Sequence, residues 1–432
     1  MILDAYLRDT ETEALISDRA LAGAMLEVEA ALARVQGRLN IIPPEAATRI
    51  VAAAAELKVD IQALSDGTVR DGVPIIALLA QLRRAVGEGH AGYVHWGATS
   101  QDIVDTALVL MFRRVMALFA ARLDELIHVW APLAAQHRGT LMAARTRGQQ
   151  AVPTTFGLKV AGWIAPLLRH RQRLKDLRAN ILMLQLGGAG GTLAALGARG
   201  GAVAAALAAE LELRLPPMPW HNQRDGVIDF ANWLSMVNGT LGKAAGDILL
   251  LAQSEVGEVR IAGSGGSSAM PQKANPVLAE AILALARYNA GQIGVLHQAG
   301  LHFHERDGAA WTLEWLTFPG MIRTGGAGLL HSLTMARNLE IDAGRMAGNI
   351  SASHGLLLAE AASQALARHM PKPEAQSLVK AACLEVTDSR DLIQILAART
   401  KAEVDWAALR DPGNYLGAAE QFIDAVLEDI PS

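Results

Sequence analysis

Cysteine is almost missing from this 432-residue sequence, which contains only Cys383. A single thiol cannot form a disulfide within the chain, and it cannot supply the several thiolates of a metal cluster. Aromatic residues make up only 4% of the sequence, although 51% of it is hydrophobic. Alanine, leucine and valine must therefore form most of the core, and this composition favours closely packed helices over sheets.

Neither sign of charge dominates the sequence. Its 39 basic and 43 acidic residues give a net charge of −4, and they are mixed along the chain. The sequence has no basic tract of the kind that binds nucleic acid. Charged residues interrupt the apolar stretches, and the N-terminus carries Asp4 where a signal peptide would be apolar. We therefore expect a cytoplasmic protein without a nucleic-acid or membrane partner.

Helical periodicity is the feature that the sequence has in abundance. Apolar residues recur at steps of three and four over residues 21–39, which predicts a helix there. Two prolines at 43–44 end that pattern and predict a second helix, because proline is tolerated in a first turn. A third pattern predicts a helix from about residue 225 to residue 255, roughly 45 Å long. We find no alternating pattern that would predict a strand.

The chain is longer than one compact core usually allows. We predict an all-α protein with an N-terminal helical domain at residues 1–90, a central helical bundle at residues 91–340 and a C-terminal helical domain at residues 341–432. Helices as long as the one predicted near residue 225 usually lie in a bundle or between subunits, and we expect both.

A first polar cluster, residues 95–102 (His-Trp-Gly-Ala-Thr-Ser-Gln-Asp), has the form of a helix start. Thr99, followed three residues later by Asp102, is a capping box. The free N–H groups of a helix N-terminus also suit a substrate carboxylate, and Thr99 and Ser100 would add hydroxyl donors. His95 is near enough in sequence to donate a proton. The structural and the functional interpretation both stay open.

Two further clusters combine arginine with glutamine. Residues 145–155 contain two arginines, two glutamines and three threonines, and they either bind anions or form a solvated turn before a helix at Phe156. Residues 220–225 precede the long helix, and an arginine there can bind a carboxylate through two parallel hydrogen bonds while Asp225 caps the helix. The candidate side chains in these two clusters are Arg145, Thr146, Gln149, Gln223 and Arg224.

Two other clusters bear on cofactors. The glycines at 187–191 fail the dinucleotide fingerprint because Leu193 stands where it needs glycine, and they favour a bend or close helix packing. His302 and His304 are two positions apart and would point to different sides of a helix, whereas metal ligands on one face need spacings of three or four. We predict no metal or redox cofactor, and we regard Arg306 as a candidate anion contact.

Residues 266–276, Gly-Ser-Ser-Ala-Met-Pro-Gln-Lys-Ala-Asn-Pro, form the most specific pattern in the sequence. Glycines precede this loop, and a helix containing Glu280 is expected to follow it. Such a loop can close over an anion, bring the Ser267 hydroxyl to it and exclude water, with Lys273 and Asn275 as further contacts. The pattern is too long for chance to explain it.

The loop resembles the signature sequence of the fumarase/aspartase superfamily, and the resemblance covers nearly the whole chain. Within that superfamily the chain looks most like the bacterial 3-carboxy-cis,cis-muconate cycloisomerases, over passages such as residues 26–33, 95–106, 186–197 and 304–306. The resemblance implies a three-domain all-α fold whose central long helices assemble into the twenty-helix core of a homotetramer. It also implies active sites shared between subunits, without metal or redox cofactor.

The resemblance further implies an activity and its residues. The expected reaction adds a substrate carboxylate to an alkene, converting 3-carboxy-cis,cis-muconate to 4-carboxymuconolactone in protocatechuate degradation. Ser267 would be the general base when the lactone is opened, and His95 is the candidate proton donor. The residues expected to bind the polycarboxylate are Thr99, Ser100, Arg145, Thr146, Gln149, Gln223, Arg224, Lys273, Asn275 and Arg306.

Arg147 departs from the family pattern. Many superfamily lyases carry histidine at this position and the cycloisomerases carry a bulky apolar residue, so a related substrate such as an aminodicarboxylate stays open. The main alternative is a lyase that releases fumarate from a succinyl-amine adduct of the adenylosuccinate or argininosuccinate type. A catalytically silent relative is disfavoured because Ser267, Lys273 and Asn275 are all present, and a nicotinamide dehydrogenase because the glycine fingerprint fails.

Overall fold

The computed structural model describes residues 2–263, 265–266 and 269–431, and this part of the chain is mostly helical, as predicted. The chain divides into two compact units. Unit 1 comprises Met1–Arg122, His170–Gly239 and Leu285–Leu330, and unit 2 comprises Leu123–Arg169, Thr240–Ala284 and His331–Ser432. The predicted domain borders near residues 90 and 340 stay a prediction.

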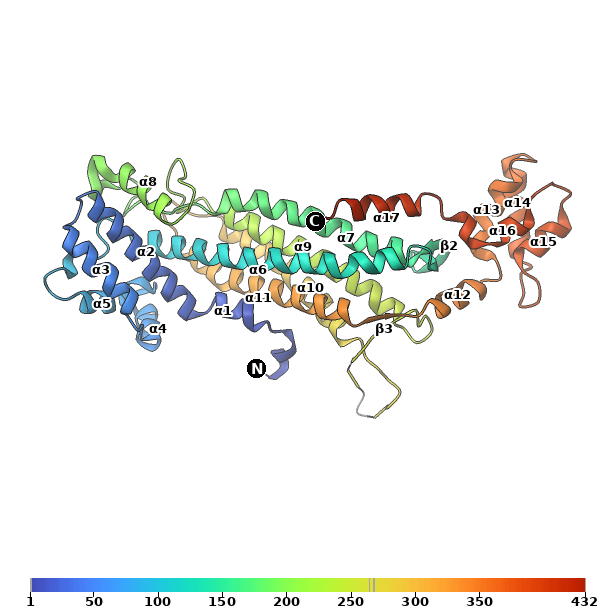
Figure 1. Cartoon of the computed structure of the whole chain (residues 1–432), viewed down its shortest axis with the longest axis horizontal. Coiled ribbons are helices and arrows are strands. Elements are labelled where there is room, and N and C mark those ends of the chain that lie inside the picture. Colours follow the sequence, from blue (N-terminus) through green and yellow to red (C-terminus); the bar gives the residue numbers. More distant parts are fainter. Residues whose placement is uncertain (1, 264, 267–268, 432) are drawn as a thin grey trace. The chain divides into compact units, whose positions relative to one another are not determined.

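Unit 1 contains the shorter helices of the N-terminal region together with η3 and α8 (Figure 1). The predicted helices at 21–39 and after the two prolines are confirmed as α2 and α3. They pack so closely that a Cβ on Gly37 would lie 2.5 Å from the Cβ of Ala47. The elements are η1 (Ile2–Leu7), α1 (Thr10–Leu15), α2 (Asp18–Arg38), α3 (Pro44–Glu56), α4 (Ile61–Asp71), α5 (Ile75–Val86), η2 (Ala91–Tyr93), η3 (Ala194–Arg199) and α8 (Gly200–Glu210).

Five longer helices contribute residues to both units. They are α6 (Ser100–Gln136), α7 (Phe156–Ile181), α9 (Asp225–Leu251), α10 (Val277–Ala299) and α11 (Gly308–Arg337). Helix α9 begins at Asp225, as predicted, and ends four residues before the predicted end. In unit 1 the helices α6, α9 and α11 meet through Phe112, Phe230 and Phe318, whose rings pack edge to face with centroids 5.1 to 5.7 Å apart.

Unit 2 contains a β-hairpin that the sequence did not predict. Strand β1 (Leu141–Thr146) pairs in antiparallel fashion with β2 (Gln149–Thr155), so the expectation of a chain without strands is wrong. The register shifts between Ala143 and Arg145, and β2 contains Pro153. A bulge and a proline both interrupt the regular alternation by which strands are recognised in a sequence. A second, shorter pair joins β3 (Val259–Ile261) to β4 (Leu339–Ile341).

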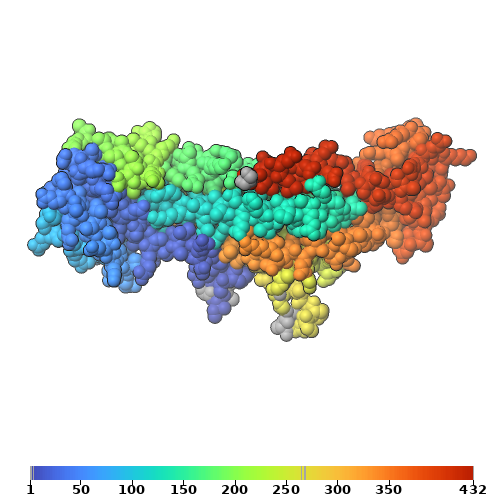
Figure 2. All heavy atoms as spheres, viewed as in Figure 1, coloured from blue at the N-terminus to red at the C-terminus, as the bar shows by residue number. Residues whose placement is uncertain are grey.

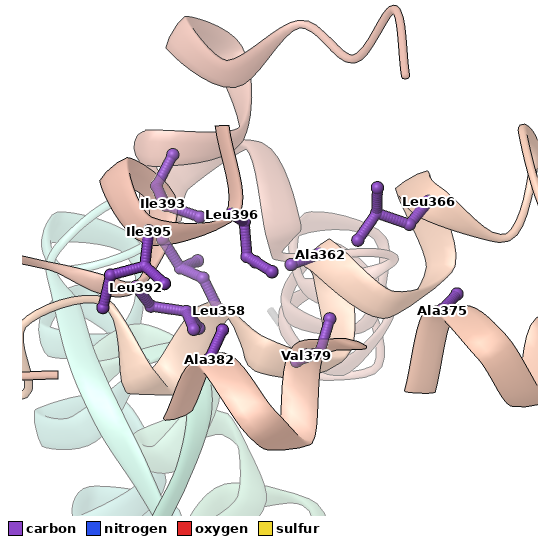
Figure 3. Packing of buried hydrophobic residues seen from close by; sticks show 10 residues of the cluster. All are labelled: Leu358, Ala362, Leu366, Ala375, Val379, Ala382, Leu392, Ile393, Ile395 and Leu396. Carbon is purple, nitrogen blue, oxygen red and sulfur yellow. The ribbon is translucent and has the colours of Figure 1, made fainter. Parts of the chain in front are cut away.

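The C-terminal helices of unit 2 have a core of their own. Figure 3 shows the packing of Leu358, Ala362, Leu366, Ala375, Val379, Ala382, Leu392, Ile393, Ile395 and Leu396, all of which are buried. The elements here are α12 (Ala343–Ser351), η4 (Leu356–Leu358), α13 (Ala359–Leu366), α14 (Lys372–Cys383), α15 (Leu392–Arg399), α16 (Trp406–Arg410), η5 (Pro412–Tyr415) and α17 (Ala419–Glu428). Within the described ranges, none of the helices is long and apolar enough to cross a membrane.

Candidate active site

Helix α6 begins at Ser100, as the sequence predicted, and its N-terminus is organised around Asp102. The backbone N–H of Thr99 donates to the Asp102 carboxylate at 3.0 Å, which confirms one half of the predicted capping box. The N–H groups of Gly187 and Gly188 donate to the same carboxylate at 2.8 and 2.9 Å. Because Asp102 is fully buried and its oxygens are engaged, it holds the site together.

His221 supplies a further donor to the same carboxylate. Its Nε2 lies 2.8 Å from Oδ1 of Asp102, and both side chains are buried. Gly187 passes so near that a Cβ on it would lie 2.8 Å from the His221 ring. The glycine cluster therefore permits close packing, as predicted, and the chain segment it belongs to is tied to the start of α6.

Arg306 lies against the hydroxyl group of Thr99. Its Nη1 donates to Thr99 Oγ1 at 2.7 Å, and its Nη2 donates to the carbonyl oxygen of Ala189. The backbone just before Arg306 is held as well, because Nδ2 of Asn222 donates to the carbonyl oxygen of His304 at 2.6 Å. A guanidinium group, a hydroxyl group and a helix N-terminus thus converge, and each of them favours a bound anion.

His95 stands four residues before Thr99 in a strained turn. Its φ is +68°, in the left-handed region that side chains other than glycine rarely adopt. The Nδ1 of its ring lies 2.5 Å from Oε1 of Glu29 in helix α2, and the Glu29 carboxyl group is 1% exposed. The predicted proton donor is therefore held by a buried acid that the sequence gave no reason to single out.

Arg224 is buried among acidic side chains. Its guanidinium group is 1% exposed and pairs with Asp105 at 2.8 Å and with Glu314 at 2.6 Å. Burial alone would lower the pKa of Arg224, but the two carboxylates outweigh that effect and raise it. A contact between Arg224 and substrate stays a prediction. The ion pairs support a structural role for Arg224, which holds the backbone next to the exposed Gln223.

Arg145 anchors the β-hairpin of unit 2. It donates two hydrogen bonds to the buried carboxylate of Glu258, at 2.9 and 2.7 Å, and Asn349 donates to Glu258 at 2.8 Å. This bidentate geometry is the strong form of an arginine–carboxylate pair. Substrate binding by Arg145 stays a prediction, and its guanidinium group already pairs with Glu258.

The tip of the hairpin presents the other predicted residues of this cluster. Arg147 and Gly148 have φ values of +53° and +80°, the pattern of a two-residue turn of type I′. Thr146, Arg147 and Gln149 are exposed there. Among the described residues Arg147 has no ion-pair partner, so its charge is available to an anion.

The predicted catalytic loop is described only in part. Ser267 lies outside the described residues. Lys273 is exposed, and Asn275 is partly exposed, with its backbone N–H donating to the carbonyl oxygen of Gly265 at 2.8 Å. That hydrogen bond closes the base of the loop just before α10, and Figure 2 shows yellow residues of this segment at the molecular surface.

The two histidines considered as metal ligands lie in different surroundings. Both ring nitrogens of His302 are buried and have no hydrogen-bond partner within the described ranges, whereas His304 is exposed. Across the described part of the chain, no group of three or more histidine, cysteine, aspartate and glutamate side chains could hold a metal ion.

Comparison with known proteins identifies the family. A family model described as a lyase matches residues 4–291. The chain belongs to this lyase family. A 3-carboxy-cis,cis-muconate cycloisomerase of Pseudomonas aeruginosa is 42% identical to this lyase over 440 residues, covering 99% of this chain and 96% of the relative. A nitrosuccinate lyase of Streptomyces davaonensis is 37% identical, with 98% and 93% covered.

A solved structure shares the fold of this lyase. The crystal structure of 3-carboxy-cis,cis-muconate lactonizing enzyme from Pseudomonas putida matches with a TM-score of 0.93 and 38% identity, covering 99% of this chain and 98% of that one. The predicted all-α fold of the fumarase/aspartase type is thereby confirmed over the length of the chain.

The predicted site residues fall into two groups in this lyase. His95, Thr99, Ser100, Gln223, Arg224 and Arg306 belong to unit 1, whereas Arg145, Thr146, Gln149, Lys273 and Asn275 belong to unit 2. Within unit 1 the structure brings Thr99 and Arg306 into direct contact. Sequence reasoning missed the buried acids that hold the predicted side chains. These acids are Glu29, Asp105, Glu258 and Glu314, and no local motif marks them.

Proposed function

We propose that this lyase is a 3-carboxy-cis,cis-muconate cycloisomerase that acts in the cytoplasm during the breakdown of aromatic compounds. It adds a carboxylate of its substrate to an alkene carbon and forms 4-carboxymuconolactone. The observation that carries the proposal is the 42% identity to an enzyme of that name over 99% of the chain. The unbroken pattern at residues 266–276 supports it.

The substrate is a tricarboxylate, and the contact between Thr99 and Arg306 supplies one suitable anion site. In the proposed complex a substrate carboxylate accepts hydrogen bonds from the Arg306 guanidinium, the Thr99 hydroxyl and the Ser100 hydroxyl at the start of α6. The exposed Gln149 and Gln223 orient the remaining carboxylates. Fixing a flexible molecule in this way brings its attacking oxygen to the alkene and lowers the entropic cost of ring closure.

Proton transfer falls to the loop and to His95. When the lactone forms, one substrate carboxylate attacks the alkene, and the neighbouring carbon, itself beside a carboxylate, takes up a proton. In our proposal Ser267 delivers that proton, and His95, the candidate proton donor, returns a proton to the Ser267 hydroxyl. Both transfers run in reverse when the lactone is opened. Lys273 and Asn275 hold the carboxylate on which negative charge develops, and fixed donors aimed at such charge usually contribute most to catalysis.

Several copies of the chain complete the site in this proposal. The candidate residues are divided between unit 1 and unit 2, and the side chains of Thr146, Arg147 and Gln149 are exposed at the hairpin tip. We propose a homotetramer with a core of twenty helices, in which each active site takes residues from more than one subunit.

The test of the activity is direct. The purified protein is mixed with 3-carboxy-cis,cis-muconate, and the ultraviolet absorbance of the conjugated diene is followed, with the lactone identified by mass spectrometry and NMR. Loss of the diene with lactone formation supports the proposal. Turnover of adenylosuccinate, argininosuccinate or another succinyl-amine adduct to fumarate, without lactone formation, would replace the cycloisomerase by a fumarate-releasing lyase.

Replacing Ser267 with alanine tests the mechanism. We expect kcat to fall by about 10² to 10⁴-fold, because a positioned acid–base group contributes that much to proton transfer. The oligomeric state, measured by analytical ultracentrifugation, should not change. Ser268→Ala is the matched control, and a Ser267→Ala enzyme as fast as the wild type would rule out the assigned role.

A further inference from the structure

The pair formed by Glu29 and His95 has a feature that packing alone does not explain. Oε1 of Glu29 lies 2.5 Å from Nδ1 of His95, whereas Oε2 is buried and has no hydrogen-bond partner among the residues that the structure describes. A buried carboxylate with a free oxygen is costly, because the oxygen has lost its water and gained nothing in return. An apolar side chain would fill the same place in α2 at lower cost.

Helix α2 fixes the His95 turn at two points. Glu29 holds the ring, and Gln36, two helical turns further along, donates from Nε2 to the carbonyl oxygen of Trp96 at 2.7 Å. Gly97, which follows, is held against Leu196, since a Cβ on Gly97 would lie 2.7 Å from two carbon atoms of that side chain. The backbone and the ring of His95 therefore have little freedom.

This geometry determines which ring nitrogen carries hydrogen. A carboxylate can only accept a hydrogen bond, so Nδ1 of His95 is the protonated nitrogen and Nε2 carries the lone pair. Among the described residues Nε2 has no hydrogen-bond partner, and the side chain is 12% exposed. The atom that can exchange a proton with a ligand is thus Nε2, on a ring held four residues before the Thr99 hydroxyl.

We propose that Glu29 is a positioning residue of the active site. It keeps His95 in the tautomer whose Nε2 faces the substrate, and it balances the positive charge of the ring whenever Nε2 takes up a proton. This inference rests on the proposed function, in which His95 is the second acid–base group. It adds a residue that touches no substrate and acts only through the imidazole ring.

Glu29→Gln removes the charge but keeps the shape of the side chain. An amide can donate or accept, so it pairs with either tautomer and no longer selects one. We expect kcat to fall at least about tenfold while KM stays within about twofold, because Thr99 and Arg306 still hold the substrate. The ¹⁵N NMR signals of His95, assigned by comparison with His95→Gln, should change from one tautomer to a mixture.

A double-variant cycle separates this role from a structural one. If Glu29 acts through the ring, Glu29→Gln combined with His95→Gln will be no slower than His95→Gln alone. Gln36→Met is the matched control from the same helix: it removes the bond to Trp96 but should leave the tautomer of His95 unchanged. Additive losses in the double variant, or a wild-type tautomer in Glu29→Gln, would overturn the proposal.

Two further results keep the interpretation unambiguous. Glu29→Asp is the second variant if circular dichroism shows that Glu29→Gln does not fold. It retains the negative charge and should keep the tautomer of His95. We expect kcat to fall, because the shorter side chain places the carboxylate further from the His95 ring. The NMR measurement needs no substrate. A protein that does not convert 3-carboxy-cis,cis-muconate but shows the single tautomer would contradict the proposed function and leave the role of Glu29 intact.

Discussion

His302 is a partly buried residue, and both nitrogens of its ring are shielded from solvent. Burial lowers the pKa of its imidazole, and the positive charge of Arg224 lowers it further. In the unfolded chain the same group has its ordinary pKa, near 6.5. The unfolded state therefore takes up a proton first as the pH falls. The contribution of neutral His302 to the free energy of unfolding is therefore complete above about pH 6.5. It is lost as the pH drops toward the lowered pKa of the folded state.

His302→Leu should remove this part of the pH dependence. Between about pH 8 and pH 5 the wild type is expected to lose more thermal stability than the variant, measured as Tm by calorimetry. The exposed His297 provides the control, because His297→Gln should follow the wild-type curve. A His302→Leu curve parallel to that of the wild type would show that the buried ring does not titrate as we expect.

Arg224 and Arg306 illustrate what a sequence can and cannot reveal about individual residues. Both arginines lie in polar clusters, and both were predicted to bind substrate. Arg224 pairs with acids 119 and 90 positions away along the chain, and Arg306 contacts Thr99 from 207 positions away. Local sequence patterns contain no information on such distant partners. The residue types could be predicted, whereas which of them are buried and paired could not.

At the scale of elements, helices were predictable and the hairpin was not. The presence of α2 and the starts of α3 and α9 followed from apolar spacing and from proline and capping residues, all of which act within a few positions. The end of α9 was predicted four residues too late. Strand β1, by contrast, has a shifted register between Ala143 and Arg145. Glu258, which anchors the hairpin through Arg145, is distant in the sequence. The local sequence therefore showed neither a regular strand alternation nor the contact that stabilises the hairpin.

The start of helix α6 depends on the charge of Asp102. Asp102→Asn would turn an NH₂ group toward backbone N–H groups that now donate to a carboxylate. We expect this change to destabilise the protein by about 1 to 3 kcal/mol for each donor left unsatisfied. Urea unfolding followed by circular dichroism measures the loss. Asp225→Asn, at the exposed start of α9, is the control, and equal stability of the two variants would contradict the role of Asp102.

At the scale of the whole molecule, the proposed tetramer predicts that two inactive variants can restore each other. Ser267→Ala and Arg306→Ala are each expected to be inactive because each removes one part of every site. If these parts come from different subunits, mixed tetramers contain some sites in which both are intact. After the two variants are unfolded and refolded together, we expect about a quarter of the wild-type activity, since each part is intact in about half of the subunits.

The control for this experiment mixes the two proteins without unfolding them, so that no subunits exchange. Activity there should stay at the level of the separate variants. Refolded mixtures that remain inactive, although they form tetramers by analytical ultracentrifugation, would mean that both residues of each site come from one subunit. The cycloisomerase assignment would survive that result, whereas the shared site would not.

In the β-hairpin of unit 2, the residue that stabilises the strands is different from the residues exposed at the turn. Arg145 fixes the strands through Glu258, which also accepts a hydrogen bond from Asn349. At the turn, a Cβ on Gly148 would meet no described atom within 4 Å, but the φ values of +53° and +80° restrict which residues can replace Arg147 and Gly148. A replacement of Arg147 that tolerates this φ would change the exposed charge at the turn and leave the contacts of Arg145 in place. If the proposed function holds, a change of charge at Arg147 should alter substrate preference without any change in the helices.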